Sequence, residues 1–196
     1  GAGIAQTLKV RLIHSTIRNL ILRGAPPDAL QAGLRTLPPL AQPAAKPTLY
    51  QTLFARGWNV ADSGLPCNQE ELAYTLLTFS HVFLRSLRRL GIGLPRADEE
   101  AYLHAWNVVG HVLGIERGLM ADTMEQAASL FARMQAQGRS QALVPDPRPA
   151  LGTALMQTMA QSIPWPVAQP VPVLLTRHLC GRETAHDLGL DRRVPL

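Results

Sequence analysis

The chain has 196 residues, of which 46% are hydrophobic and only 5% aromatic, with Leu and Ala carrying most of the apolar content. This composition excludes a disordered or fibrous protein and favours packed helices over a β-sandwich. Nineteen Lys and Arg against fourteen Asp and Glu give a net charge of +5. Lys9 and Lys46 are the only lysines, so the dense mixed runs of a nucleic-acid-binding arm are absent and no nucleic-acid partner is predicted.

The sequence carries few marks of a cellular compartment. No apolar run reaches the length of a transmembrane segment, and the start shows no signal-peptide pattern. Cys67 and Cys180 lie far apart and in no motif, so we expect two free thiols. Because the chain begins at Gly1, a cytoplasmic location and export followed by removal of a targeting segment both remain open.

Apolar residues at helical spacing predict a series of helices. Asn68 is expected to cap one of them at its N-terminus and Gly91 to end the same helix, and Gly138 is expected to end a later one. No segment shows sustained strand alternation, so we predict an all-α fold, with residues 1–196 forming a single-domain helical bundle. In chain order, the expected helices span residues 3–23, 28–36, 48–57, 69–90, 97–115, 121–137, 150–162 and 171–180.

The first helix holds an unusual stretch, RLIHSTIR. Arg11 lies three residues before His14 and Arg18 four residues after it, so the three side chains share one helical stripe. The stripe beside it is apolar and is expected to face a core: Val10, Ile13, Ile17, Leu20 and Ile21. A single histidine suffices as an axial haem ligand, and arginines pair with carboxylates such as the haem propionates. The alternative is a histidine at the edge of the core between two solvent-reaching arginines.

Other motifs indicate packing rather than chemistry. The six histidines include no HxxxH or HExxH pair, and His104 and His111 lie about 10 Å apart along one helix, too far to share one ion. No CxxC, GxGxxG, GxxxxGK[ST] or GxSxG motif is present. Gly110 and Gly114 favour close helix packing, although a flat cofactor against bare backbone is the alternative. The densest basic run suits the solvated face of a helix: Arg85, Arg88 and Arg89.

The ordered set RLIHSTIR, GLPCNQEELAYTLLTFSHVFLRSLRRLGIGL, EEAYLHAWNVVGHVLGI and LLTRHLCGRETAHDLGL resembles the catalytic domain shared by rubber oxygenase (latex clearing protein) and the MpaB oxygenases. The resemblance runs from about residue 8 to 190 and implies an all-helical protein with haem b, whose relatives cleave double bonds of polyisoprenoids with O2. It implies His14 as the proximal iron ligand, with Arg11 and Arg18 supporting the haem. Asn68, Thr75 and His111 also match recurring positions; Thr75 would line a pocket and His111 would hydrogen-bond near the site.

We therefore expect a haem b-dependent oxygenase that acts with O2 on a small, apolar, unsaturated, isoprenoid-like substrate. In the rubber oxygenases, polar residues of the distal side, including a glutamate proposed as a base, precede the histidine helix. Here thirteen residues precede His14 and contain no carboxylate, so either that upstream segment is missing from this sequence or this relative works without it. The alternatives are a non-catalytic haem-binding or haem-sensing protein and a cofactor-free helical interaction module.

Overall fold

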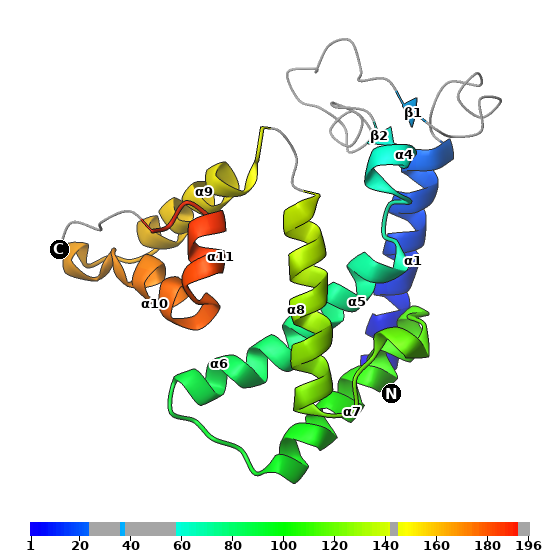
Figure 1. Ribbon diagram of the computed structural model, residues 1–196, viewed down its shortest axis with the longest axis horizontal. Helices are drawn as coiled ribbons and strands as arrows, with labels where there is room; N and C mark the ends of the chain where they lie inside the picture. The colour runs from blue at the N-terminus through cyan, green and yellow to red at the C-terminus, as the bar shows by residue number, and fades with distance from the viewer. Residues whose placement is uncertain (24–35, 38–57, 142–144, 192–196) are drawn as a thin grey trace.

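The computed structural model describes residues 1–23, 36–37, 58–141 and 145–191. Figure 1 shows α5, a π-helical segment and α6 following one another as a long rod, with α8 crossing it and α7 running back beside it. α1 lies near the α5 end of this rod, and α9–α11 lie toward the α6 end. In chain order the elements are α1 (Ala2–Arg23), β1 (Thr36–Leu37), β2 (Trp58–Asn59), α4 (Val60–Ser63), α5 (Gln69–Leu77), the π-helical η1 (Thr78–Val82), α6 (Phe83–Arg89), α7 (Arg96–Leu113), the 3₁₀ turn η2 (Arg117–Leu119), α8 (Met124–Ser140), α9 (Arg148–Gln161), the 3₁₀ turn η3 (Pro166–Ala168), α10 (Val171–Cys180) and α11 (Arg182–Asp187). The predicted all-α fold class is confirmed.

Local chemistry explains where the central helices begin and end. The Asn68 side chain accepts a hydrogen bond from the backbone N–H of Glu71, whose carboxylate accepts one from the Asn68 N–H, which together form a capping box at the start of α5. The Thr123 side chain caps α8 in the same way, by accepting from the N–H of Gln126. Gly114 ends α7 with φ 88°, a left-handed conformation that favours glycine.

The larger apolar core lies where α5, η1 and α6 meet α7 and α8. Gly110 of α7 sets the closeness of this packing, because an added Cβ would lie 2.8 Å from the Leu76 side chain. The packing interpretation of this glycine is therefore the one that the structure supports. The buried members of the core are Ala73, Leu76, Leu77, Leu84, Leu103, Ile115, Ala121, Met124, Ala127, Leu130, Phe131 and Met134.

The C-terminal helices enclose a smaller cluster of their own, formed by Met156, Ala185 and Leu190. Polar contacts join these helices to the rest of the chain. Arg139 of α8 pairs with Asp187 of α11 at 2.8 Å, and Arg148 lies 3.4 Å from the same carboxylate. No helix in the described ranges is both long and apolar enough to cross a membrane.

Most predicted helices in the described ranges are observed within three residues of their expected ends. α8 continues through Gly138 to Ser140, so the stop predicted at Gly138 is wrong; this glycine lies in an exposed turn of the helix where no left-handed cap is formed. The short elements α4 and α11 were not expected. The helix predicted at 28–36 and the one at 48–57 fall outside the described residues, apart from position 36, which lies in the antiparallel β1–β2 pair.

The apolar stripe of α1 is buried only at its C-terminal end. Ile21 is buried, whereas Val10 and Ile13 are exposed and Ile17 is half-buried. The prediction that the whole stripe faces a core is therefore wrong for its first part. The reason is that α1 lies along α7 at the edge of the molecule, outside the larger core (Figure 1).

An ion pair with a buried carboxylate joins α6 to α7. Glu99 in the first turn of α7 is 1% exposed, and Arg88 donates to both of its carboxylate oxygens, with Nε 2.6 Å from Oε1. The arginine run that includes Arg88 is thus not simply a solvated face: Arg85 lies over the Phe131 ring, and Arg89 donates to two carbonyls of α10.

We expect Arg88→Ala to lower the free energy of unfolding by about 3 kcal/mol, because it leaves the Glu99 carboxylate buried without a partner. The matched control is Arg96→Ala, which removes the exposed pair with Glu100 and should cost about 0.5 kcal/mol or less. Urea denaturation followed by circular dichroism measures both values. Equal, small losses in the two variants would contradict this role for Arg88.

His81 lies in the π-helical segment between α5 and α6 and is 4% exposed. Its ring tilts against Phe131, and no group of the described residues hydrogen-bonds its buried Nδ1. Burial, followed by the charges of Arg85 and Arg88, lowers the pKa of His81 from 6.5 to about 4. At neutral pH the imidazole is therefore uncharged and serves as an apolar core residue.

This depressed pKa predicts a pH-dependent stability. Below pH 6.5 the unfolded His81 takes up a proton that the folded one resists until about pH 4, so the free energy of unfolding should fall as the pH drops through this window. His81→Gln removes the titrating group, so its stability should depend less steeply on pH between about 6.5 and 5. The exposed His104 gives the control variant His104→Gln, which should keep the wild-type slope. Denaturation curves with unchanged slope in His81→Gln would refute the assignment.

Candidate functional site

Arg11 ties the first helix to the end of α7. Its Nη1 donates to the carbonyl of Val112 at 2.9 Å. Val112 lies in the last turn of α7, where carbonyls have no partner within the helix. Gly114, the next residue but one, leaves room for this contact, because a Cβ there would come within 3.3 Å of Arg11 Nη2. Close packing, rather than a flat cofactor, therefore accounts for the second glycine of this helix as well.

Arg18 ties the same helix to the turn that precedes α5. Its Nε donates to the carbonyl of Pro66 at 3.0 Å, and its Nη2 donates to the carbonyl of Cys67. Cys67 adopts φ 53°, a left-handed conformation that is unusual for a residue other than glycine. Burial, then the Glu71 charge, raises the pKa of the Cys67 thiol against the opposing effect of Arg18, so this free thiol is protonated at neutral pH.

Gln69 joins the start of α5 to the end of α7, the two segments that Arg18 and Arg11 contact. Its Nε2 donates to the carbonyl of Gly114 and its Oε1 accepts from the N–H of Glu116, each at 2.9 Å. The start of α5 and the end of α7 therefore form one hydrogen-bonded unit on which α1 lies. Sequence reasoning missed Gln69, because a glutamine next to an N-cap carries no signal of a partner more than forty residues away.

His14 lies on α1 between the two arginine contacts. It is half-buried, and neither ring nitrogen has a hydrogen-bond partner among the described residues. Val10, one turn before it, and Ile13 are exposed apolar residues, and Ile17 follows one turn later. An imidazole with unused nitrogens beside uncovered apolar side chains suits the edge of a large apolar cofactor.

These residues fit a haem better than a bare metal ion. In the described ranges no three His, Cys, Asp or Glu side chains come together as ion ligands. A haem iron needs only one histidine, since the porphyrin supplies four nitrogens. The arginines fit less simply, because each already donates to backbone carbonyls: Arg11 through Nη1, and Arg18 through Nε and Nη2.

The other expected site residues are not joined to His14. Thr75 is exposed on α5, and His111 is exposed in the last turn of α7. Within the described residues no hydrogen bond links either side chain to the histidine. The Asn68 side chain is engaged in the capping box of α5, so capping alone accounts for it.

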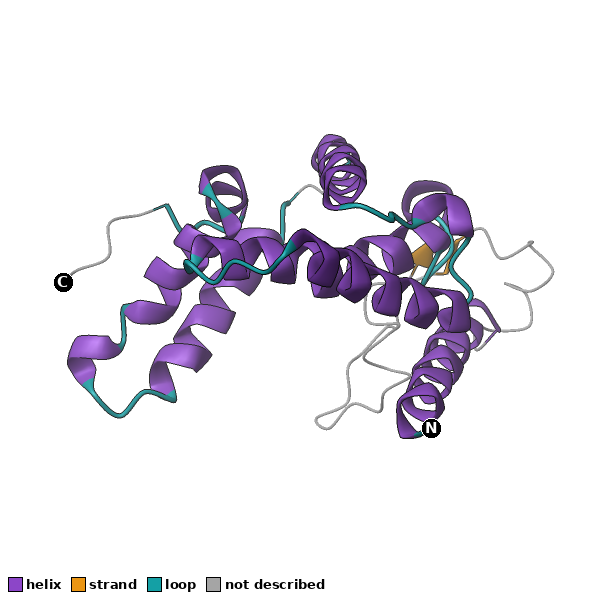
Figure 2. Ribbon diagram, turned by 90° about the horizontal axis from the view of Figure 1, so that it is seen from below, coloured by secondary structure: helices purple, strands orange, loops and turns teal. Residues whose placement is uncertain are grey.

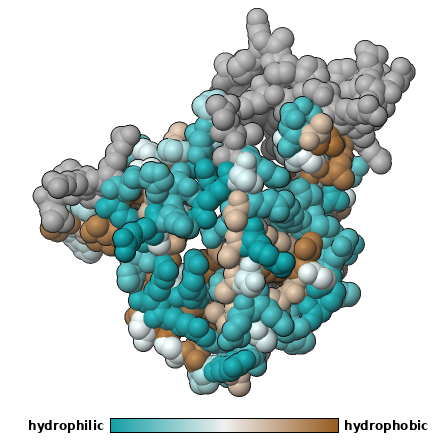
Figure 3. All heavy atoms as spheres, viewed as in Figure 1, coloured by the Kyte–Doolittle hydropathy of each residue, from teal (hydrophilic) through white to brown (hydrophobic). Residues whose placement is uncertain are grey.

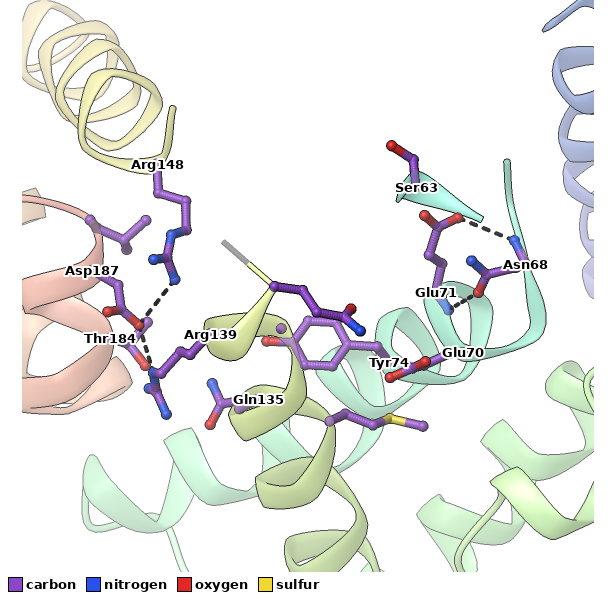
Figure 4. Close-up of a pocket in the computed structure, with 14 residues that line it drawn as sticks. Ser63, Asn68, Glu70, Glu71, Tyr74, Gln135, Arg139, Arg148, Thr184 and Asp187 are labelled. Atoms are coloured by element: carbon purple, nitrogen blue, oxygen red, sulfur yellow. Dashed lines mark hydrogen bonds and ion pairs between the residues drawn. The ribbon is translucent and has the colours of Figure 1, made fainter. Parts of the chain in front are cut away.

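A cleft of about 450 Å³ opens between α5 and α8 on one side and the C-terminal helices on the other. Figure 4 shows Asn68, Glu70, Glu71 and Tyr74 along one wall, facing Arg148, Asp187 and Thr184, with Arg139 pointing toward Asp187. Its lining includes charged and amide side chains from both walls. His14, Arg11, Arg18, Thr75 and His111 do not line it.

The chain is similar in sequence to known oxygenases. Over 198 aligned residues, the chain is 21% identical to a protein named rubber oxygenase from Streptomyces sp. (strain K30). The match covers 100% of this chain and 40% of that protein, so the chain spans about two fifths of its relative's length. No solved structure matches. Residues 44–195 match the family described as "ER-bound oxygenase mpaB/B'/Rubber oxygenase, catalytic domain". The chain therefore belongs to the mpaB/rubber oxygenase catalytic-domain family.

Proposed function

We propose that this chain binds haem b with His14 as the proximal iron ligand and uses O2 to oxidise an apolar, unsaturated, isoprenoid-like substrate. The observation that carries this proposal is the half-buried His14, whose ring nitrogens have no partner among the described residues, on a helix held by arginines on both sides. The alignment with the rubber oxygenase includes the α1 segment, whereas the family match begins at residue 44.

Each residue around His14 has a role that follows from its contacts. When bound, haem supplies the chemistry of O2 activation. Arg11 and Arg18 hold α1 against α7 and the turn before α5, and so fix the position of the imidazole. Val10 and Ile13 offer exposed apolar surface on the same helix, which would help to exclude water from a bound cofactor.

The substrate class rests on the family rather than on a pocket of this chain. The relative's name refers to rubber, an apolar polymer, and the family is one of oxygenase catalytic domains. The thirteen residues before His14 contain no carboxylate. We therefore propose no catalytic base within α1, and the residues of this chain are assigned to ligation, positioning and exclusion of water.

We expect His14→Ala to abolish stable haem binding, because it removes the iron's protein ligand. His104 lies on the exposed side of α7, so His104→Ala should bind haem like the wild type and gives the matched control. The intensity of the Soret band after haemin titration measures both. A His14→Ala protein with stoichiometric haem and an unaltered spectrum would contradict the assignment and would make His111 the next ligand to test.

Oxygen uptake separates an oxygenase from a non-catalytic haem protein. The haem-loaded wild type should consume O2 when an isoprenoid is added and yield carbonyl products, detected by mass spectrometry. A Soret band without isoprenoid-dependent uptake would favour haem binding or sensing alone. The absence of a Soret band would leave a helical interaction module, and the proposal would be abandoned.

We further expect Arg18→Ala to weaken haem retention by roughly tenfold and to lower the stability of the haem-free protein by about 2 kcal/mol, since it removes two hydrogen bonds from a charged donor. The exposed Arg133 on α8 gives the control variant Arg133→Ala, which should change neither value. If Arg18 only paired with a haem propionate, the stability of the haem-free protein would not change. Thermal unfolding with and without haem distinguishes the two roles.

A further inference from the structure

Residues 149–176 contain no Asp, Glu, Lys or Arg. This uncharged segment runs through α9, η3 and the first half of α10, and it is bounded by Arg148 and Arg177. Charged residues make up 17% of the chain as a whole, so a stretch of this length without one departs strongly from the composition around it. We call α9, η3 and α10 together the C-terminal hairpin.

The C-terminal hairpin exposes large apolar side chains along its whole length. At its connection Val167 is 90% exposed and Trp165 is 68% exposed. Figure 3 shows apolar side chains at the edge of the molecule where the hairpin lies. The exposed large apolar residues of the hairpin are Leu151, Leu155, Met159, Trp165, Val167, Val171, Leu174 and Leu175.

The inner face of α9 is already packed, so the exposed side chains are additional to its core contact. Met156 is buried in the smaller core, and a Cβ on Gly152 would come within 2.5 Å of the Leu188 carbonyl oxygen. A surface helix of a water-soluble domain is polar on the face opposite its core. α9 instead adds an outer stripe of Leu151, Leu155 and Met159, which nothing in the described chain covers.

The shape of the hairpin suits shallow insertion into an apolar phase. Figure 2 shows it projecting from the other helices, with its connection at the outer end. α9 has 14 residues and α10 has 10, which correspond to about 21 and 15 Å of helix. Both are shorter than the roughly 30 Å hydrocarbon core of a bilayer, so the hairpin has the size of an element that lies in the interface.

We propose that the C-terminal hairpin docks into the interface of a lipid bilayer, with Trp165 and Val167 entering first. The absence of charge favours a bilayer over a protein partner. The hydrocarbon boundary excludes ions, and the hairpin has no charged residue over 28 positions. A surface that binds a protein partner usually has polar and charged groups at its rim. Tryptophan is the side chain that most often anchors a protein at this boundary. The charges at the base, from Arg148 and Arg177 onward, stay in water, and the net charge of +5 favours anionic headgroups.

Vesicle binding tests the proposal on the full chain. Co-sedimentation with equimolar phosphatidylcholine and phosphatidylglycerol vesicles should show binding that persists at about 0.5 M NaCl, where charge attraction is screened. Val167→Glu and Leu155→Glu should each weaken binding to the vesicles roughly tenfold or more, because each places a charge where the proposal inserts an apolar side chain into the bilayer. The control Ile92→Glu makes the same change at a 51% exposed residue outside the hairpin and should bind like the wild type.

Fluorescence quenching tests whether the hairpin enters the bilayer. Phosphatidylcholine with brominated acyl chains should quench the wild-type emission, and Trp165→Phe, which leaves Trp58 and Trp106, should lose most of that quenching while still binding. Three outcomes would overturn the proposal: no vesicle binding, binding that high salt abolishes, or binding that both glutamate variants retain. Concentration-dependent dimers that Val167→Glu dissociates, without vesicle binding, would assign the surface to a second copy of the chain instead.

Discussion

Arginine side chains join the helices of this molecule by donating hydrogen bonds to backbone carbonyls at helix ends and in a turn. A helix ends with carbonyls that have no partner inside it, and a guanidinium can satisfy two at once without needing a carboxylate. Arg89 of α6 does this for two carbonyls of α10, with Nη1 2.9 Å from His178 O and 2.7 Å from Leu179 O. Arg11 satisfies one carbonyl at the end of α7, and Arg18 satisfies two in the turn before α5. The excess of arginine over lysine, first seen in the composition, therefore has a structural use.

The same constraint shapes the site. Both arginines on the histidine stripe are engaged by backbone, so in the proposed haem site they act first as positioning residues for His14 rather than as free partners for propionates. Each keeps N–H groups that have no partner among the described residues, so in the proposed site pairing with a cofactor carboxylate adds to the contact with the protein and does not replace it. The helix that carries His14 depends on these few polar contacts, since the first part of its apolar stripe is exposed. A change that weakens the attachment of α1 should therefore also displace His14.

Periodicity and capping were enough to predict the fold class and most long helices. Asn68 starts α5, and Gly91, with φ 79°, follows the end of α6; both were predicted from neighbouring residues. What depends on distant partners could not be predicted in this way. The buried Glu99 resembles any glutamate in a first helical turn until Arg88 is placed beside it, and the π-helical insertion at His81 leaves no spacing signal. The exposed part of the α1 stripe shows the same limit, since periodicity identifies an apolar face but not whether the described chain covers it.

The most direct test of the central claim is imidazole rescue of a His14→Gly variant. Removing the side chain should leave a protein that does not retain haem, and free imidazole should restore a haem spectrum with a nitrogen ligand, because it can occupy the space that the side chain left. Absorption and electron paramagnetic resonance spectra of the two samples report the ligand. Haem binding should depend on imidazole in the variant and be independent of it in the wild type. A His14→Gly protein that binds haem with the wild-type spectrum in the absence of imidazole would contradict it.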